Sequence, residues 1–187
     1  MTRPRMLFDG DTFTRGGYTF RVLIERDNDI GEPWKEYDGH GPVSEWTTRA
    51  KGPGERVLNS DRGSKRYYDI AEATKIARRD GWGCEHTTVT EADGKRVVSS
   101  GHKTRGEAIA CAVERDYNHL RAWCEDRWYY VSVGVVHVDD GEDGEREYLG
   151  GVSSEDDAYI ADVADELADQ IIARLEVDNP DVQLSEN

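Results

Sequence analysis

The clearest strand signal in this chain is Trp128-Tyr-Tyr-Val-Ser-Val-Gly-Val-Val-His-Val138. β-Branched and aromatic residues dominate this stretch, and they favour the extended conformation. A Gly-bounded turn at 141–144 follows, and residues 145–150 return as the second strand of a hairpin. The next element is a helix that begins near Ser154 and ends near Glu176, with apolar residues at three- and four-residue steps. The last third of the chain therefore predicts a hairpin followed by an amphipathic helix.

Two further helices are predicted upstream of this hairpin. The first spans Tyr67–Asp80 and stops at Gly81, which can adopt the left-handed conformation of a helix cap. The second opens at Thr104, where Thr104 and Glu107 fit a capping box, and continues to about residue 125.

Strands and loops fill the remaining upstream part of the chain. Residues 18–25 predict a strand, and residues 34–37 predict a short return strand. Asp93-Gly94 predicts the turn of another hairpin. Residues 38–64 contain seven Gly or Pro residues and show no clear period, so we expect a long ordered loop.

These elements indicate an α+β fold of antiparallel hairpins with three helices. The order strand, turn, strand, helix recurs three times along the chain. Short similar sequences accompany this repeated order, such as Trp82-Gly-Cys-Glu85 and Trp123-Cys-Glu125. Two interpretations stay open: an internal repeat, or similar turn chemistry arising independently.

Charge is distributed unevenly along the 187 residues. The chain contains 39 acidic and 24 basic residues, a net charge of −15. Residues 1–124 hold 20 acids and 21 bases, whereas residues 125–187 hold 19 acids and three bases. We therefore divide the chain into a near-neutral region at 1–124, which includes the loop 38–64, an acidic hairpin–helix unit at 125–178 in the same domain, and a loose tail at 179–187.

Composition also restricts the location and the partners. No apolar run approaches the roughly 20 residues that span a bilayer, and no apolar segment follows the basic start as in a secretory signal. Three cysteines without Cys-x-x-Cys spacing favour free thiols in the cytoplasm. Because like charges repel, strong net acidity disfavours direct binding to a phosphate backbone. Neither a membrane partner nor a cofactor is predicted, and the oligomeric state stays open.

The helix at 154–176 places its acids opposite its apolar stripe. Successive carboxylates would lie about 4.5 to 6 Å apart along the axis, an interval of the same order as that between DNA phosphates. The candidate partner-binding residues are those of this ridge and of the preceding hairpin: Asp162, Asp165, Glu166 and Asp169, with Asp139, Asp140, Glu142, Asp143 and Glu145. The ridge fits either a solvated face or a surface that imitates nucleic acid toward a basic partner.

Two alternative functions stay open. Carboxylates at Asp27, Asp29, Glu32 and Asp38 could hold a divalent metal in a small enzyme, since such ions prefer oxygen ligands. The basic residues around the first helix could instead contact nucleic acid together with neighbouring tyrosines. They are Arg62, Lys65, Arg66, Lys75, Arg78 and Arg79. No catalytic residue and no complete metal-ligand set is predicted.

One region of the sequence resembles a known group of proteins. The matching stretches are Gly31-Glu-Pro-Trp-Lys-Glu-Tyr-Asp-Gly-His-Gly-Pro-Val-Ser-Glu-Trp46, Arg62-Gly-Ser-Lys-Arg-Tyr-Tyr-Asp69 and Ala77-Arg-Arg-Asp-Gly-Trp-Gly83. They resemble accessory proteins of bacteriophages and prophages, over residues 18–83. The resemblance implies a phage protein in the bacterial host cytoplasm and assigns no catalytic residues. By analogy with small acidic phage inhibitors, we expect a non-enzymatic protein that binds a host defence enzyme of the CRISPR or restriction type.

Overall fold

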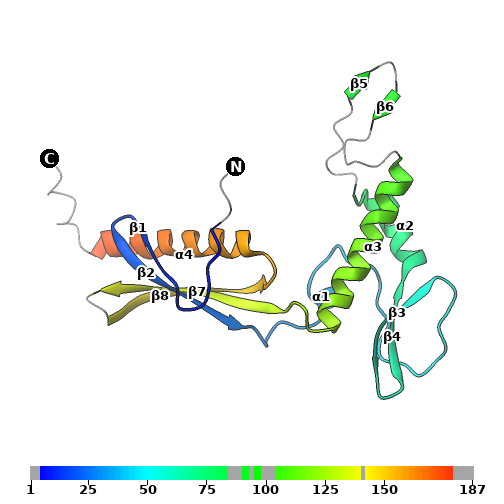
Figure 1. Cartoon of the computed structure of the whole chain (residues 1–187), viewed down its shortest axis with the longest axis horizontal. Coiled ribbons are helices and arrows are strands. Elements are labelled where there is room, and N and C mark those ends of the chain that lie inside the picture. The colour runs from blue at the N-terminus through cyan, green and yellow to red at the C-terminus, as the bar shows by residue number, and fades with distance from the viewer. Residues whose placement is uncertain (1–4, 84–89, 93–94, 98–103, 140–141, 179–187) are drawn as a thin grey trace. The chain divides into compact units, whose positions relative to one another are not determined.

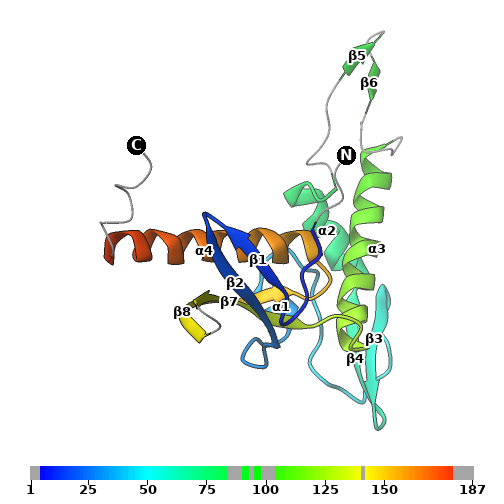
Figure 2. The same cartoon turned by 60° about the vertical axis from the view of Figure 1, so that its left-hand side comes forward.

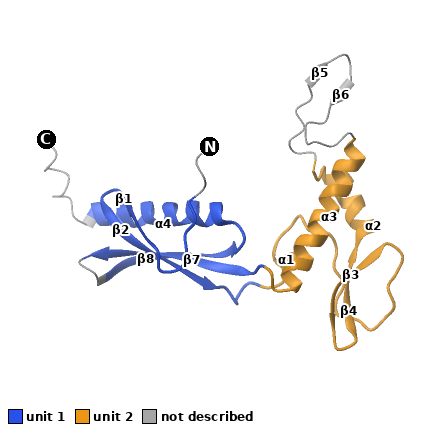
Figure 3. Cartoon of the chain, viewed as in Figure 1, with its two compact units in different colours: residues 1–30, 128–187 blue, residues 31–127 orange. Residues whose placement is uncertain are grey.

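The computed structural model describes residues 5–83, 90–92, 95–97, 104–139 and 142–178. It contains both helices and antiparallel sheets, so the α+β class is confirmed (Figure 1). The chain divides into two compact units (Figure 3). Unit 1 comprises residues 1–30 and 128–187, and unit 2 comprises residues 31–127.

Unit 1 is a four-stranded antiparallel sheet with one helix on a face. Its elements are β1 (Thr12–Arg15), β2 (Tyr18–Arg26), β7 (Tyr130–Asp139), β8 (Glu142–Ser153) and α4 (Asp157–Asp178). The strand order is β1-β2-β7-β8, and α4 lies along the sheet in both views (Figures 1 and 2). The strand at 18–25 is therefore confirmed, and it pairs with the strand predicted at 128–138.

Alternation along the strands builds the core of unit 1. Val131, Val133 and Val135 of β7 are almost fully buried and belong to the same apolar cluster as Phe20 and Val22 of β2. The stripe of α4 completes this cluster with Ile160, Val163, Ala164, Leu167, Ala168 and Ile171. Because side chains alternate across a strand, the intervening residues of β7 face away from α4.

Unit 2 combines two hairpins with three helices. Its elements are α1 (Pro33–Glu36), β3 (Glu55–Asp61), β4 (Ser64–Asp69), α2 (Ile70–Asp80), β5 (Thr90–Ala92), β6 (Lys95–Val97) and α3 (Arg105–Cys124). Its core joins Leu58 and Tyr68 of the β3–β4 hairpin to apolar residues of α2 and α3. The capping box at Thr104 and Glu107 is confirmed, with both hydrogen bonds present.

Several local predictions for unit 2 are wrong. Residues 34–37 do not form a strand, because Pro33 begins the single-turn helix α1. The stretch 38–64 is not all loop, since β3 occupies Glu55–Asp61. The first long helix begins at Ile70 rather than Tyr67, because β4 continues to Asp69 and the Asp69 carboxylate caps the helix.

The start of α4 also differs from the prediction. Ser154 does not cap the helix: its hydroxyl accepts a hydrogen bond from the Tyr129 amide at 3.0 Å. Asp156 takes the capping role, accepting the Tyr159 amide at 3.0 Å. Both residue types can cap a helix, so composition alone did not distinguish them.

The division into units follows different boundaries from those drawn from charge. The strands within residues 12–26 share one sheet with those at 130–139 and 142–153, so the near-neutral region at 1–124 contributes to both units. Along the described elements the order strand, strand, helix occurs four times rather than three. These groups are not equivalent modules, because the first and last hairpins join one sheet whereas the other two hairpins each stand alone.

Candidate interaction surfaces

The two units differ sharply in charge. Unit 1 contains 22 acidic and seven basic residues, whereas unit 2 contains 17 of each. The whole net charge of −15 therefore belongs to unit 1. The N-terminal residues add five acids and five bases to this unit, so they leave its net charge unchanged while supplying most of its arginines.

The structure places most of the predicted partner-binding acids on α4 and on the β7–β8 hairpin of unit 1. On α4 lie Asp162, Asp165, Glu166 and Asp169, and on the hairpin lie Asp139 in β7 and Glu142, Asp143 and Glu145 in β8. Asp140 lies outside the described residues. Asp162 and Glu166 are exposed and one helical turn apart, so they share one solvent-facing strip of α4.

The acidic ridge predicted on α4 carries no base of its own, but the fold brings two to it. Arg5 contacts Asp165 at 2.6 Å, and Arg15 contacts Asp165 at 2.9 Å and Asp169 at 2.5 Å. The hydrogen bond from Arg15 holds the pKa of Asp169 below its ordinary value. Half of the ridge is thus neutralised by a segment more than 150 residues away in the sequence.

The acidic hairpin is neutralised in the same manner. Arg21 of β2 contacts Asp143 at 2.8 Å, and Arg174 of α4 contacts Glu145 at 3.2 Å and also Glu147. Of the predicted binding residues whose side chains the structure describes, this leaves Asp139, Asp162 and Glu166 without an ion pair. The predicted surface is therefore a strip of unpaired carboxylates bordered by ion pairs.

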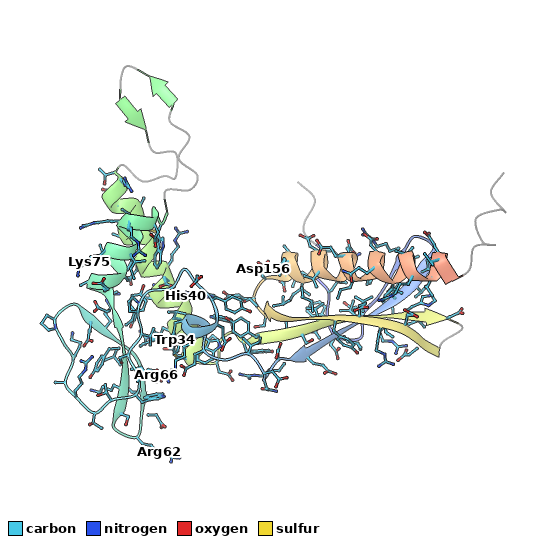
Figure 4. The ribbon with its side chains drawn as sticks, turned by 180° about the vertical axis from the view of Figure 1, so that it is seen from behind. Trp34, His40, Arg62, Arg66, Lys75 and Asp156 are labelled. Atoms are coloured by element: carbon cyan, nitrogen blue, oxygen red, sulfur yellow. The ribbon has the colours of Figure 1, made fainter. Side chains whose placement is uncertain are left out.

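The basic residues near α2 offer less free charge than the sequence indicates. Lys75 pairs with Glu72 at 2.6 Å, and Arg79 pairs with Asp80 at 2.7 Å. Arg62 is 94% exposed at the β3–β4 turn (Figure 4). The α2 surface is therefore close to neutral, which weakens it as a phosphate-binding face.

Arg66, another member of this basic group, is buried. Its guanidinium lies 5.2 Å from the ring of Trp34 and 4.9 Å from that of Trp46, and it bonds to Glu32 (Figure 4). Lys35 joins the same group through Glu32 at 3.0 Å. A guanidinium stacked in this way stabilises unit 2 and is not available to a nucleic acid.

The proposed metal ligands are divided between the two units. Asp27 and Asp29 belong to unit 1, whereas Glu32 and Asp38 belong to unit 2. The Asp27 carboxylate accepts the amides of Asp29 at 3.1 Å and Gly151 at 3.0 Å, so its oxygens stabilise backbone turns. Within the described ranges, no group of three or more His, Cys, Asp or Glu side chains could hold a metal ion.

A buried polar network in unit 2 escaped the sequence analysis. Asp116 of α3 accepts the Gly41 amide at 2.8 Å and the Tyr68 hydroxyl at 2.6 Å, and its other oxygen lies 2.6 Å from His40 Nδ1. Burial and the nearby carboxylate raise the pKa of Tyr68. The network ties the loop at His40, which Figure 4 labels, to α3. Its one sequence signal was a carboxylate inside the apolar face formed by Val113, Tyr117 and Leu120.

The described cysteines are free thiols. Cys111 and Cys124 are both half-buried, and burial raises the pKa of the Cys124 thiol to about 11. A thiol that is protonated at neutral pH is a poor nucleophile, so Cys124 serves packing rather than covalent chemistry. Cys84 lies outside the described residues.

Comparisons with protein-family profiles, with curated proteins and with solved structures each return no match. Among the helices that the structure describes, none is both long enough and apolar enough to cross a membrane.

Proposed function

We propose that this protein is a non-enzymatic binding protein whose unit 1 engages the basic surface of a nucleic-acid-binding protein. The observation that carries the proposal is the segregation of charge, since unit 1 holds the entire net charge of −15 and unit 2 is balanced. A negative electrostatic potential over one unit attracts a basic partner and accelerates its association.

The described geometry indicates how such a surface would bind. Asp162 and Glu166 are exposed, lie one turn apart and form no ion pair with the residues that the structure describes, so they can meet basic side chains directly. Arg5 and Arg15 fix the carboxylates beside them, which limits the entropy lost on binding. The setting that we propose is a bacterial cell, where a phage accessory protein of this kind would occupy the nucleic-acid groove of a defence enzyme.

A capture experiment with competition by DNA tests the proposal. The immobilised full chain is incubated with bacterial lysate at roughly 50 mM salt, where electrostatic contacts are strong, and bound protein is eluted with duplex DNA. The test variant is Asp162→Lys with Glu166→Lys. The matched control is Asp38→Lys with Asp61→Lys, which changes the net charge equally at two exposed residues of unit 2.

The expected result is capture of a nucleic-acid-binding protein that DNA displaces, with loss of capture in the unit 1 variant only. Equal capture by the wild type and the unit 1 variant, or a bound protein that DNA leaves in place, would contradict the proposal. Equal loss in both variants would show that net charge alone, without a defined surface on α4, accounts for binding.

A further inference from the structure

Unit 1 contains a cavity of about 310 Å³ where the N-terminal segment, the end of β2, the start of β7 and the start of α4 meet. Figure 4 marks this end of α4 by Asp156. Most of the residues that line it are apolar or aromatic: Leu7, Phe8, Ile24, Tyr129, Val131 and Ile160. A volume near the lower limit of small-ligand sites suits one long side chain rather than a drug-sized molecule.

Three polar residues also line the cavity, and two of them are engaged by the backbone. Asp9 accepts the Ile24 amide at 2.9 Å, and the Ser154 hydroxyl accepts the Tyr129 amide at 3.0 Å. Asp157, in the first turn of α4, makes no side-chain hydrogen bond or ion pair with the described residues. The cavity therefore combines apolar walls with one carboxylate that is free to receive a cation.

Aromatic rings in this unit already accept guanidinium groups. The Arg26 guanidinium lies 4.5 Å from the centre of the Tyr129 ring, and the Arg5 guanidinium lies 4.6 Å from that of Phe13. Arg26 is not among the residues that line the cavity. Tyr129 and Asp157 both line the cavity, so a guanidinium bound there would lie close to an aromatic residue and to a carboxylate residue.

We infer that this cavity is the anchor site for an arginine or lysine side chain of the basic partner, an inference that rests on the proposed function. Such side chains carry an apolar stem and a charged head, which match the apolar wall and Asp157 respectively. The net charge of unit 1 repels anionic ligands, so charge complementarity also selects a cation. The cavity would give the partner a defined contact point that the diffuse ridge on α4 does not supply.

A titration with small probes tests the inference without the partner. The full chain, labelled with ¹⁵N, is titrated with N-acetyl-arginine methylamide while amide chemical shifts are recorded. The neutral isostere N-acetyl-citrulline methylamide serves as the ligand control. We expect saturable shifts at residues 7–9, 129–131 and 154–160, and binding of the arginine probe roughly tenfold tighter than that of the citrulline probe, as for one charge-assisted hydrogen bond.

Two variants assign the preference to the cavity. Asp157→Asn should abolish the discrimination between the probes, whereas Glu176→Gln, an equal charge change at an exposed residue near the other end of α4, should keep it. Phe8→Ala removes an exposed part of the apolar wall and should weaken both probes equally. Amide spectra and thermal melting of each variant establish that it folds.

Three outcomes would overturn the inference. The first is equal affinity for the two probes, which would indicate a purely apolar site. The second is chemical-shift changes confined to the Asp162 and Glu166 strip, and the third is the absence of saturable shifts. None of these depends on capture of a partner. Failure at the cavity would therefore leave the proposed function standing, and loss of capture would leave the probe result intact.

Discussion

At the scale of single residues, one carboxylate of α3 contributes most clearly to local order in unit 2: Asp116, whose side chain is only 9% exposed. It accepts the Gly41 amide and the Tyr68 hydroxyl and lies against His40, so its removal leaves several donors without acceptors. An unsatisfied buried donor costs about 1–3 kcal/mol, more than the hydrogen bond itself contributes.

We therefore predict that Asp116→Ala lowers the free energy of unfolding by about 2–3 kcal/mol. Denaturant melting of the full chain, followed by tryptophan fluorescence, gives this value. The control is Glu114→Ala, two residues earlier on α3, which removes a half-exposed ion pair with Arg56 and should cost less than about 1 kcal/mol. A smaller loss for Asp116 than for Glu114 would contradict the role given to the network.

Glu55 is the residue with a marked pH signature. The Glu55 carboxylate accepts hydrogen bonds from the Arg49 guanidinium at 2.5 Å and from the Gly52 amide at 2.6 Å. These bonds lower the pKa of Glu55 from the ordinary 4.5 to about 2. Because the folded pKa is depressed, the stabilisation is fully present above the unfolded pKa near 4.5. It is lost as the pH falls toward 2.

We predict that Glu55→Gln lowers the melting temperature at pH 7 and that the difference from the wild type shrinks between pH 4.5 and 2. Thermal melting across this pH range measures the effect. Glu36→Gln, a change of an exposed glutamate in the same unit, should show no such convergence. A difference that stays constant with pH would rule out the linkage.

At the scale of elements, helix caps and the pairing of neighbouring strands contribute to the stability of the fold. In α3 the Thr104 hydroxyl accepts the Glu107 amide at 3.1 Å while the Glu107 carboxylate accepts the Thr104 amide at 3.2 Å. In the sheet of unit 1, Gly134 of β7 pairs with Tyr148 of β8, and a Cβ at Gly134 would collide with the Tyr148 ring.

For the helix cap, Thr104→Ala should lower the free energy of unfolding by about 1 kcal/mol, because one orphan amide loses its acceptor. Circular dichroism during denaturant unfolding measures the change. Thr48→Ala, at an exposed residue outside helices and strands, is the control and should be nearly neutral. An equal effect at both residues would argue against a capping contribution.

For the strand pair, Gly134→Ala should destabilise unit 1 because the rigid β-strands force the new methyl group into the Tyr148 ring. The double variant Gly134→Ala with Tyr148→Ser should recover part of the loss by removing the ring. A double-mutant cycle on the free energy of unfolding measures this coupling. Strict additivity of the two changes would contradict the packing of the ring over Gly134.

At the scale of the whole molecule, charge separates the two units. Unit 1 carries all of the net charge and experiences self-repulsion, whereas unit 2 is balanced at 17 acids and 17 bases. Some carboxylates of unit 1 are compensated by ion pairs with Arg5, Arg15, Arg21 and Arg174. Salt screens the repulsion between the remaining carboxylates.

We predict that raising the ionic strength from roughly 0.01 M to 1 M, which shortens the Debye length from about 30 to about 3 Å, slows amide exchange in unit 1 and changes unit 2 little. Hydrogen exchange of the full chain, resolved by peptide, measures both units in one sample, with unit 2 as the internal reference. Faster exchange in unit 1 at high salt would mean that its ion pairs outweigh its self-repulsion.

The secondary-structure predictions were correct where the sequence signals behind them were local. The strand at 128–138, the capping box at Thr104 and the helix after Ser154 each depend on residues within a few positions of one another. Errors occurred where neighbours overrode propensity, as when Pro33 began a helix at a stretch predicted to be a strand, or when β4 continued through Tyr67. Of the candidate site, the sequence identified which elements carry the acids but not which acids are unpaired.

The sequence by itself determined the alternation of strands and helices, the capping box at Thr104 and the concentration of acidic charge in the last third. Only the tertiary structure decided that β2 pairs with β7 across an intervening unit, that Arg15 meets Asp169 over 154 positions, and that Asp116 is buried against His40. The physical reason is the distance along the sequence over which each kind of interaction acts. Periodicity and capping act through bonds between near neighbours, whereas these contacts form when the core closes distant segments onto one another, and no local pattern encodes their partners.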